Sequence, residues 1–440
     1  MEEIRMRRIM QIFEQKKIEN IPEEISTQLE EIRLSERIKP GMQIGITVGS
    51  RGIKNIPLII KCVIEEVKKR RGVPFILTAM GSHGGATAEG QRKVLENYGV
   101  TEKTMGVPIK SSMDVVELGR LENGLPVYFD KVAFEADGIV VVNRIKVHTA
   151  FKSVIESGLC KMLAVGLGNH EGASLVHHLG VKGLRDYMVD FAKVILGRAP
   201  VLCGLGILEN AYDDTYRLTA AVSEDFERAD MELLKECKRI MPALPVSGID
   251  ILIVEEIGKN ISGTGMDTNI VGGIREYRGG EYDSPKIKKI IALDLTKETE
   301  GNALGIGLAD LITRKLHNKI DFGATYENTI TTTFLERAKI PIVCKTEEEA
   351  FQIALKTIWN LPGTEPRMMI IRNTLKLDEL YVSENIWGEI SNRSDMRPCG
   401  DWEKLRFDHQ GDLMLRVLSW SPTAKAVAPP PLRRNVTMRG

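Results

Sequence analysis

The fold is decided by two stretches of similar pattern, MQIGITVGSRG at residues 42–52 and PFILTAMGSHGG at residues 74–85. Each begins with a short apolar run of the kind found in buried strands and ends in a glycine-rich turn. A helical pattern of apolar residues follows each turn, over residues 59–67 and 87–98. Strands that alternate with helices in this way predict an α/β fold with a parallel sheet.

A third apolar run, residues 138–143, is also typical of a buried strand and leads directly into the loop of residues 144–148. In sheets of this kind, ligands bind at the carboxyl ends of the strands. Arg51, His83 and His148 each lie just beyond such an end. The pattern therefore places three candidate site residues at the edge of the sheet where a ligand is expected.

The chain of 440 residues is too long for one ordinary core, which favours two domains. We expect an N-terminal α/β domain over residues 1–246 and a second α/β domain over residues 247–420, with mostly parallel sheets. Residues 421–440, which include three consecutive prolines, are typical of a flexible tail. The other predicted elements are helices at 180–196, 225–241, 308–317 and 347–359 and strands at 249–255, 290–295, 368–372 and 380–383.

Composition argues against several kinds of partner. The 60 basic and 60 acidic residues balance, which leaves no electrostatic footprint for nucleic acid or an anionic membrane. No stretch approaches the roughly 18 apolar residues that a membrane helix needs. Residues 1–17 alternate charged and apolar residues at helical spacing, without the apolar core of a secretory signal. The six cysteines lack C-x-x-C spacing, so we expect a small-molecule protein of the reducing cytoplasm, without a zinc knuckle or disulfide frame.

Five of the seven histidines lie between His83 and His178, which suggests one site. Histidine both ligates metals and exchanges protons near neutral pH. The glycines around His83 leave its ring uncovered, although a plain tight turn would explain the same sequence. His170 and His177 would be about 10 Å apart along a continuous helix, and the H-E-x-x-H spacing is absent. A simple zinc hydrolase is therefore disfavoured.

Lys161 lies in the apolar run SGLCKMLAVG, residues 157–166, where a lysine is unusual unless it is paired or reactive. Partial burial would lower its pKa and free the amine as a nucleophile. The alternative is a lysine that reaches the surface while its aliphatic stem packs inside.

The loop GLGNHEG, residues 166–172, is similar to a dinucleotide-binding loop but is one residue too long and lacks a clear preceding strand. It gives weak support to a nicotinamide-dependent dehydrogenase.

With these residues in view, the chain resembles the nickel-pincer lactate racemase family across most of both predicted domains. The resemblance implies a Ni(II) pyridinium-thioamide-thiocarboxylate mononucleotide, the nickel-pincer nucleotide, covalently attached at Lys161. It also implies that His177, sixteen residues onward, is the nickel ligand beside one carbon and two sulfurs of the cofactor. Such a coordination set suits Ni(II). In that family, hydride passes from C2 of a 2-hydroxy acid to the cofactor and returns to the opposite face.

The same resemblance implies that His83 and His148 are the acid/base residues, one for each enantiomer. Arg51 corresponds to the arginine of the family that binds the substrate carboxylate, a role that suits its planar fork. Arg275 stands where the family has a substrate-site lysine. The residue three before Arg51 is Val48 rather than the usual aspartate, and the usual Gly-Gly-Arg before the lysine is absent.

Val271 and Gly272 replace a tyrosine and a glutamine of lactate racemases, so we expect a pocket with room for a larger 2-hydroxy acid, with a sugar acid as one possibility. The resulting hypothesis is a cytoplasmic racemase or epimerase with its active site in an interdomain cleft. Its partners would be a small 2-hydroxy acid and the enzymes that mature the cofactor, with no nucleic acid or membrane. Two alternatives remain: a nicotinamide-dependent hydroxy-acid dehydrogenase, and a non-enzymatic protein that binds small anions through Arg51, Lys161 and Arg275.

Overall fold

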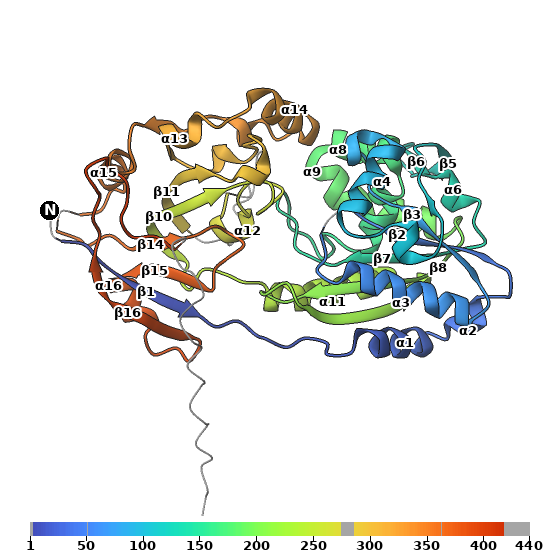
Figure 1. Ribbon diagram of the computed structural model, residues 1–440. Helices are drawn as coiled ribbons and strands as arrows, with labels where there is room; N and C mark the ends of the chain where they lie inside the picture. The colour runs from blue at the N-terminus through green and yellow to red at the C-terminus, as the bar shows by residue number, and fades with distance from the viewer. Residues whose placement is uncertain (1–2, 51, 274–285, 362, 418–440) are drawn as a thin grey trace, which may run out of the picture.

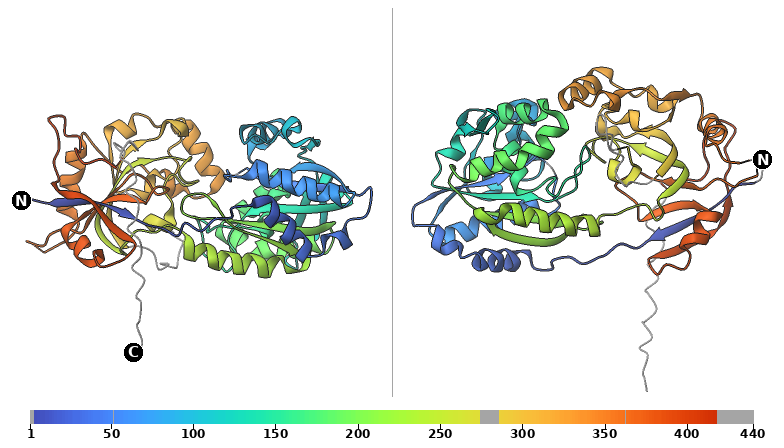
Figure 2. Two further views of the ribbon diagram at one scale, coloured as in Figure 1. Left: turned by 60° about the horizontal axis from the view of Figure 1, so that its bottom comes forward. Right: turned by 180° about the vertical axis from the view of Figure 1, so that it is seen from behind.

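The computed structural model describes residues 3–50, 52–273, 286–361 and 363–417. They form two α/β lobes side by side, each built on its own sheet (Figure 1). The chain crosses between the lobes after its first strand and again after helix α11 (Phe226–Ile240) (Figure 2). The predicted α/β fold with mostly parallel sheets is confirmed. The predicted tail at residues 421–440 lies outside the described residues.

The sheet of the first lobe runs in the order β4-β3-β2-β7-β8-β9. Its strands are parallel except β9, which pairs antiparallel with β8. Successive residues of β7 pack on opposite faces, Ile139 and Val141 in one core cluster and Val140 and Val142 in the other. A strand buried on both faces reads as a continuous apolar run, which explains why the sequence revealed it. The strands are β2 (Gln43–Val48), β3 (Val73–Thr78), β4 (Ile109–Lys110), β7 (Gly138–Arg144), β8 (Val201–Glu209) and β9 (Thr215–Val222).

The register of this sheet brings three strand ends together. Strand β2 pairs in parallel with β3 on one side and with β7 on the other. From β2 the chain proceeds outward to β3 and β4, whereas β7 leads to β8 in the opposite direction. The gap between β2 and β7 is thus a topological switch point, where open α/β sheets bind their ligands. The loops that follow β3 and β7 carry the predicted residues His83 and His148, whereas Arg51 lies outside the described residues.

Helices cover both faces of this sheet (Figure 1). A small hairpin of β5 (Val115–Arg120) and β6 (Pro126–Asp130) lies beside it. The helices of the lobe besides α11 are α1 (Ile21–Glu31), α2 (Leu34–Arg37), α3 (Ile56–Lys69), α4 (Ala88–Asn97), α5 (Glu102–Met105), α6 (Lys131–Phe134), α7 (Leu159–Lys161), α8 (Asn169–His178), α9 (Gly180–Lys182) and α10 (Met188–Leu196).

The second sheet runs in the order β13-β12-β11-β10-β14-β15-β1-β16. It is parallel from β13 to β14 and antiparallel beyond β14. The strands are β1 (Arg5–Gln11), β10 (Gly248–Ile257), β11 (Lys286–Leu295), β12 (Leu311–Thr313), β13 (Ile342–Cys344), β14 (Met368–Ile371), β15 (Glu379–Ser383) and β16 (Met396–Lys404). The helices are α12 (Thr268–Val271), α13 (Arg314–His317), α14 (Phe322–Thr332), α15 (Glu347–Thr357) and α16 (Glu384–Ile390).

Two predicted elements differ from the structure. The helical spacing at residues 1–17 was misleading, because Arg5–Gln11 is strand β1, hydrogen-bonded between β15 and β16 in the second lobe. The helix predicted at 308–317 is instead the short strand β12 followed by the single turn α13. Both strands obtain their hydrogen bonds from segments far away in sequence, so local pattern gave no reliable signal.

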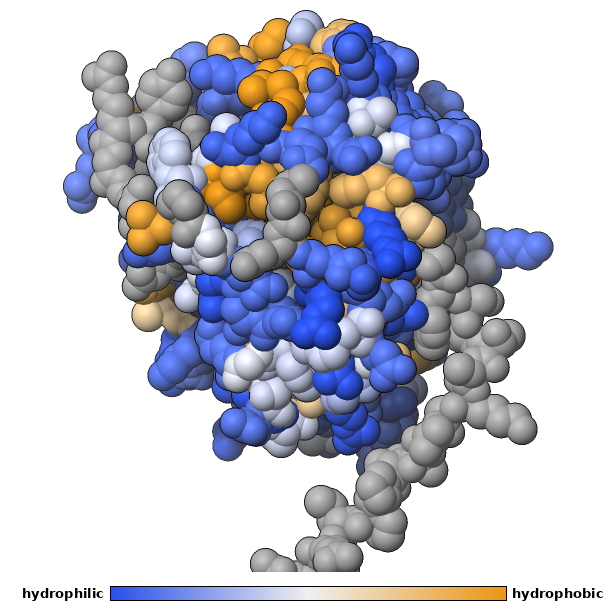
Figure 3. All heavy atoms as spheres, turned by 90° about the vertical axis from the view of Figure 1, so that its left-hand side faces the viewer, coloured by the Kyte–Doolittle hydropathy of each residue, from blue (hydrophilic) through white to orange (hydrophobic). Residues whose placement is uncertain are grey.

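No helix within the described ranges is long and apolar enough to cross a membrane. Figure 3 looks at the end of the second lobe, where apolar side chains form a band within a largely hydrophilic surface. Exposed apolar side chains in this lobe include Ile342, Trp359 and Leu361. Scattered apolar side chains are ordinary on a protein surface, so they identify no site by themselves.

Candidate functional site

One bent helical segment carries both residues predicted to hold the cofactor. Lys161 ends α7, a π-helical turn follows at Met162–Gly166, and His177 lies near the end of α8. The apolar side chains of the π-helical turn are buried in the core of the first lobe, while Lys161 and His177 are half-buried. Single π-helical turns are rare and occur frequently at functional sites.

The start of this segment is fixed by Asp230 of helix α11. Its buried carboxylate accepts hydrogen bonds from the backbone N–H groups of Leu159 at 2.8 Å and Cys160 at 2.9 Å. A Cβ atom at Gly158 would lie 2.2 Å from Asp230 Oδ1, so this close approach requires a glycine. Burial raises the pKa of Asp230 to about 6, although the two backbone bonds oppose the shift. Helix α11 therefore fixes the start of helix α7, and with it the position of Lys161 at the end of α7.

Glu156 fixes the loop that carries His148. Its buried carboxylate accepts the backbone N–H of His148 at 2.7 Å and that of Ser153 at 3.3 Å. The same carboxylate forms an ion pair with Lys238 Nζ at 2.7 Å. The imidazole of His148 packs against the ring of Phe151, with centroids 4.5 Å apart. The loop is thus anchored to α11 as well.

The structure brings His148, Lys161 and His177 into one electrostatic environment. Burial holds the pKa of His148 well below its usual value, and Lys161 is the foremost charge acting on it, followed by Lys146, His177 and Arg337. Burial also lowers the pKa of His177 to about 4, again with Lys161 as the acting charge. Both imidazoles are therefore neutral near pH 7.

His83 lies in an exposed loop that packs on the same helical segment. The backbone N–H of Gly81 donates to the carbonyl of Gly166 at 3.0 Å, at the end of the π-helical turn. Gly81 has φ of +59°, and a Cβ there would lie 2.9 Å from the carbonyl oxygen of Val165. The Nδ1 atom of His83 contacts Ser50 Oγ in the loop after β2. The ends of β2 and β3 are thereby joined beside the helix of Lys161.

The remaining candidate residues are either exposed, part of another element, or outside the described residues. Arg51 and Arg275, the predicted carboxylate-binding residues, lie outside the described residues. His170 and His178 are exposed on α8. Val271 is buried at the end of α12, and Gly272 follows with φ of +76°.

The glycine loop at residues 166–172 follows a π-helical turn and runs into α8, so no strand precedes it. A dinucleotide-binding loop joins a strand to a helix, and this geometry therefore weakens the dehydrogenase alternative.

The second lobe holds the His148 loop through side chains that sequence reasoning did not identify. Thr268 Oγ1 and Arg337 Nη2 donate to the carbonyl oxygen of Thr149 at 2.7 Å and 3.0 Å. Asn269 Nδ2 donates to the carbonyl oxygen of His148 at 3.4 Å, and its Oδ1 contacts Lys152 Nζ. The candidate site therefore adjoins both lobes, and the interdomain cleft itself stays a prediction. Thr268 and Asn269 lie just before Val271 and Gly272, which the family resemblance had selected, whereas Arg337 gave no signal in the sequence.

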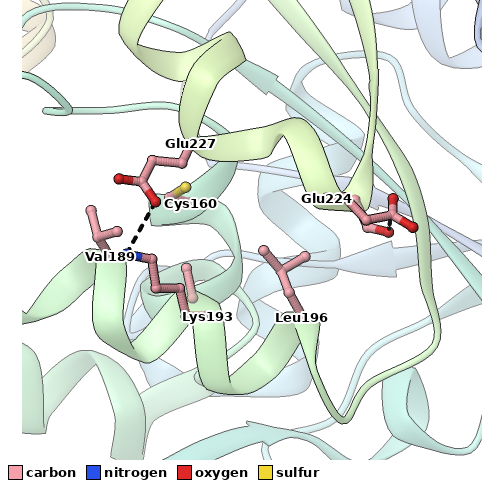
Figure 4. A pocket seen from close by; sticks show the side chains of 8 residues that line it. Cys160, Val189, Lys193, Leu196, Glu224 and Glu227 are labelled. Carbon is pink, nitrogen blue, oxygen red and sulfur yellow. Dashed lines mark hydrogen bonds and ion pairs between the residues drawn. The ribbon is translucent and has the colours of Figure 1, made fainter.

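A separate pocket of about 290 Å³ lies between α10 and the start of α11, beside Cys160 of α7 (Figure 4). It is lined by Cys160, and an ion pair of 3.1 Å joins Lys193 Nζ to Glu227 Oε2 at its wall. Its lining contains none of the candidate site residues. Burial and the carboxylate of Asp230 raise the pKa of the Cys160 thiol, so the thiol is not an activated nucleophile.

Comparison with known proteins finds a similar N-terminal domain and a similar fold. Residues 2–179 match the family model described as the lactate racemase N-terminal domain. The lactate racemase apoprotein from Thermoanaerobacterium thermosaccharolyticum has a similar fold, with a TM-score of 0.51 and 15% sequence identity over 82% of this chain and 93% of that chain. No curated protein sequence matches the chain. Fold and sequence together define a two-lobed α/β protein whose residues 2–179 are similar to the lactate racemase N-terminal domain. The likeness to lactate racemases thus rests on sequence in this N-terminal part and on fold over 82% of the chain.

Proposed function

We propose that the chain is a racemase or epimerase that inverts C2 of a 2-hydroxy acid with a nickel-pincer nucleotide tethered to Lys161. The observation that carries the proposal is the shared environment of Lys161, His148 and His177, in which the lysine charge acts on both half-buried imidazoles. Perturbed titratable groups that gather at the carboxyl ends of parallel strands are typical of an active site.

The residues present fit this cofactor. The described residues contain no group of three or more His, Cys, Asp and Glu side chains that could hold a metal by themselves. The proposed cofactor needs only one lysine and one imidazole, because its own carbon and sulfur atoms complete the metal coordination. With a pKa of about 4, His177 is neutral at pH 7, the state in which an imidazole binds a metal. When bound, the group would supply a hydride acceptor and donor.

His148 and His83 would exchange protons with the substrate hydroxyl. The Nδ1 atom of His148 accepts the backbone N–H of Ala150 at 3.1 Å, so the neutral ring carries its proton on Nε2. In this state His148 donates a hydrogen bond from Nε2 to the substrate hydroxyl, because release of that proton would leave an imidazolate. To take a proton at Nε2, the ring must first move its own proton to Nδ1 and break the bond with Ala150. His83, with its exposed ring, would serve the enantiomer of opposite configuration.

The substrate would be a small 2-hydroxy acid larger than lactate, because Val271 and Gly272 are smaller than their counterparts in lactate racemases. Arg51 and Arg275 are proposed to bind its carboxylate. The partners would be the enzymes that assemble the cofactor, and the proposed compartment is the cytoplasm.

The test is the mass of the peptide spanning residues 157–169, together with nickel content, after coexpression with cofactor-maturation enzymes. We expect added mass on Lys161 and about one nickel per chain. The peptide that contains Lys152, a half-buried lysine of the same region, is the internal control and should stay unmodified. An unmodified Lys161 in a protein free of nickel would reject the proposal.

Turnover in deuterated water separates this route from its alternatives. Hydride transfer inverts C2 without uptake of solvent deuterium, whereas an enolising base would exchange the C2 hydrogen. A dehydrogenase would instead reduce added nicotinamide cofactor, and an anion-binding protein would show only ligand-dependent stabilisation.

A further inference from the structure

Arg337 is a buried arginine without an ion pair in the described part of the chain. It lies in the single turn Leu335–Ala338 of the second lobe, and only 6% of its surface is exposed. Its guanidinium lies 4.3 Å from the ring centroid of Phe334, and Nη2 donates to the carbonyl of Thr149 at 3.0 Å. Burial lowers the pKa of Arg337 to about 10, and the charge of Glu336 offsets the shift only in part. A buried cation normally has an anionic partner.

The unused donors of Arg337 face accessible space. A guanidinium carries five N–H donors, and within the described residues its only hydrogen bond is the one to Thr149. Its Nε and Nη1 atoms are not among the fully buried polar atoms that lack a partner, so they retain solvent access. The side chain is therefore held rigidly with one edge of its planar fork available.

Other cations act on the neighbouring His148. The charges of Lys161, Lys146 and Arg337 all act on His148 and lower its pKa. The nearby Glu156 faces the backbone of this loop and forms an ion pair with Lys238. Several cations around one neutral imidazole are complementary to an anion, and a planar guanidinium suits the two oxygens of a carboxylate.

We propose that Arg337 binds the carboxylate of the substrate from the second lobe, next to the acid/base residue His148. This inference rests on the proposed function and adds a contact that the family resemblance did not assign. Because Arg337 belongs to one lobe and His148 to the other, the anion would be bound by both lobes at once.

The test uses 2-hydroxy-2-methylpropanoate, which has no hydrogen at C2 and cannot be turned over, and its uncharged amide. Binding of each is measured by titration calorimetry on the full chain. We expect Arg337→Gln to weaken carboxylate binding by about 10- to 100-fold and to leave amide binding unchanged. Arg337→Lys, which keeps the charge but not the planar fork, should lie between wild type and Arg337→Gln.

Two control variants separate anion binding from a structural role. Lys339→Gln removes an exposed cation from the same segment and should bind the carboxylate as wild type does. Thr268→Val removes the other hydrogen bond to the Thr149 carbonyl and should affect carboxylate and amide equally, if at all. Equal weakening of both ligands by Arg337→Gln, or no weakening, would overturn the inference, as would a wild-type chain that does not prefer the carboxylate. If Arg337→Gln does not fold, undiminished carboxylate binding by Arg337→Lys would overturn it.

The outcome is independent of the proposed cofactor. The titration is run on protein expressed with and without the maturation enzymes. Carboxylate binding that depends on Arg337, in a chain whose Lys161 stays unmodified and free of nickel after coexpression, would retain this inference and reject the proposed function. A modified Lys161 together with carboxylate binding that does not depend on Arg337 would support the proposed function and reject this inference.

Discussion

The carboxylate of Glu156 accepts the backbone N–H of His148 at 2.7 Å, eight residues earlier in the chain. This bond closes the loop between β7 and α7, and the ion pair with Lys238 anchors the closed loop to α11. The position of the candidate acid/base residue therefore depends on an acid that would not itself touch a substrate.

Replacing Glu156 should loosen this loop. Glu156→Ala leaves two part-buried backbone N–H groups without their acceptor and removes the ion pair with Lys238, and we expect a loss of about 2 kcal/mol in the free energy of unfolding. Chemical denaturation measures the effect. Glu122→Ala, at an exposed position of the same lobe, is the control and should lie within about 0.5 kcal/mol of wild type. A similar small effect for Glu156→Ala would contradict the anchoring role.

Gly158→Ala should displace the start of α7, because the new methyl group would lie 2.2 Å from Asp230 Oδ1. We expect at least about 2 kcal/mol of destabilisation and less cofactor attached to Lys161, as measured by thermal unfolding and peptide mass. The matched control is Gly388→Ala in α16, where a Cβ meets nothing within 4 Å. That change should be neutral or slightly stabilising, since alanine favours a helix over glycine.

Asp230 should make stability depend on pH in the acid range. Burial raises its pKa from 3.8 to about 6, so the folded state binds the proton more tightly than the unfolded state. Its stabilising contribution is fully present below about pH 4 and is lost as pH rises through 6. Relative to Asp230→Asn, wild type should therefore gain about 2–3 kcal/mol between pH 6.5 and 4. Chemical denaturation of both proteins between pH 6.5 and 4 measures this difference. A decrease in the stability of wild type relative to Asp230→Asn as the pH falls would contradict the prediction.

Lys161→Met should raise the pKa of His148 in protein that carries no cofactor. Lys161 is the foremost charge that holds this pKa down, while the effect of burial would remain. Titration of the imidazole signals by NMR measures the change. Lys193→Met removes a more exposed lysine that pairs with Glu227 and should leave the His148 signal unchanged.

The histidines should differ in their importance for turnover. We expect His83→Ala and His148→Ala each to lower kcat by about 100-fold or more, the usual contribution of a general acid or base. His178→Ala should stay near the wild-type rate because its ring is exposed at the end of α8. Chiral chromatography of the two enantiomers follows the reaction. Equal losses for all three variants would contradict these assignments.

The sequence predicted the parts of this site that local pattern determines. Buried strands β2, β3 and β7 appear as continuous apolar runs, and the loops after them could be read directly. Lys161 was noticeable because it interrupts an apolar run. The structure adds that this lysine, His148 and His177 share one environment.

Other features depend on contacts between residues far apart in the chain, which a single sequence does not display. Asp230 resembled any acid of an amphipathic helix, although its carboxylate caps a helix 70 residues earlier. Arg337 lies 188 residues from Thr149, whose carbonyl oxygen accepts its hydrogen bond. Strand β12 has only three residues, too few to show a period.

Strand β1 has a consequence for biosynthesis. Residues Arg5–Gln11 leave the ribosome before the first lobe, whereas their hydrogen-bonding neighbours, β15 and β16, are translated only after that lobe. The first lobe possesses every strand of its own sheet once Val222 has emerged, so it can mature cotranslationally. The second lobe must keep a place between β15 and β16 for a strand that was translated before the whole first lobe, so its sheet is completed only after a long delay.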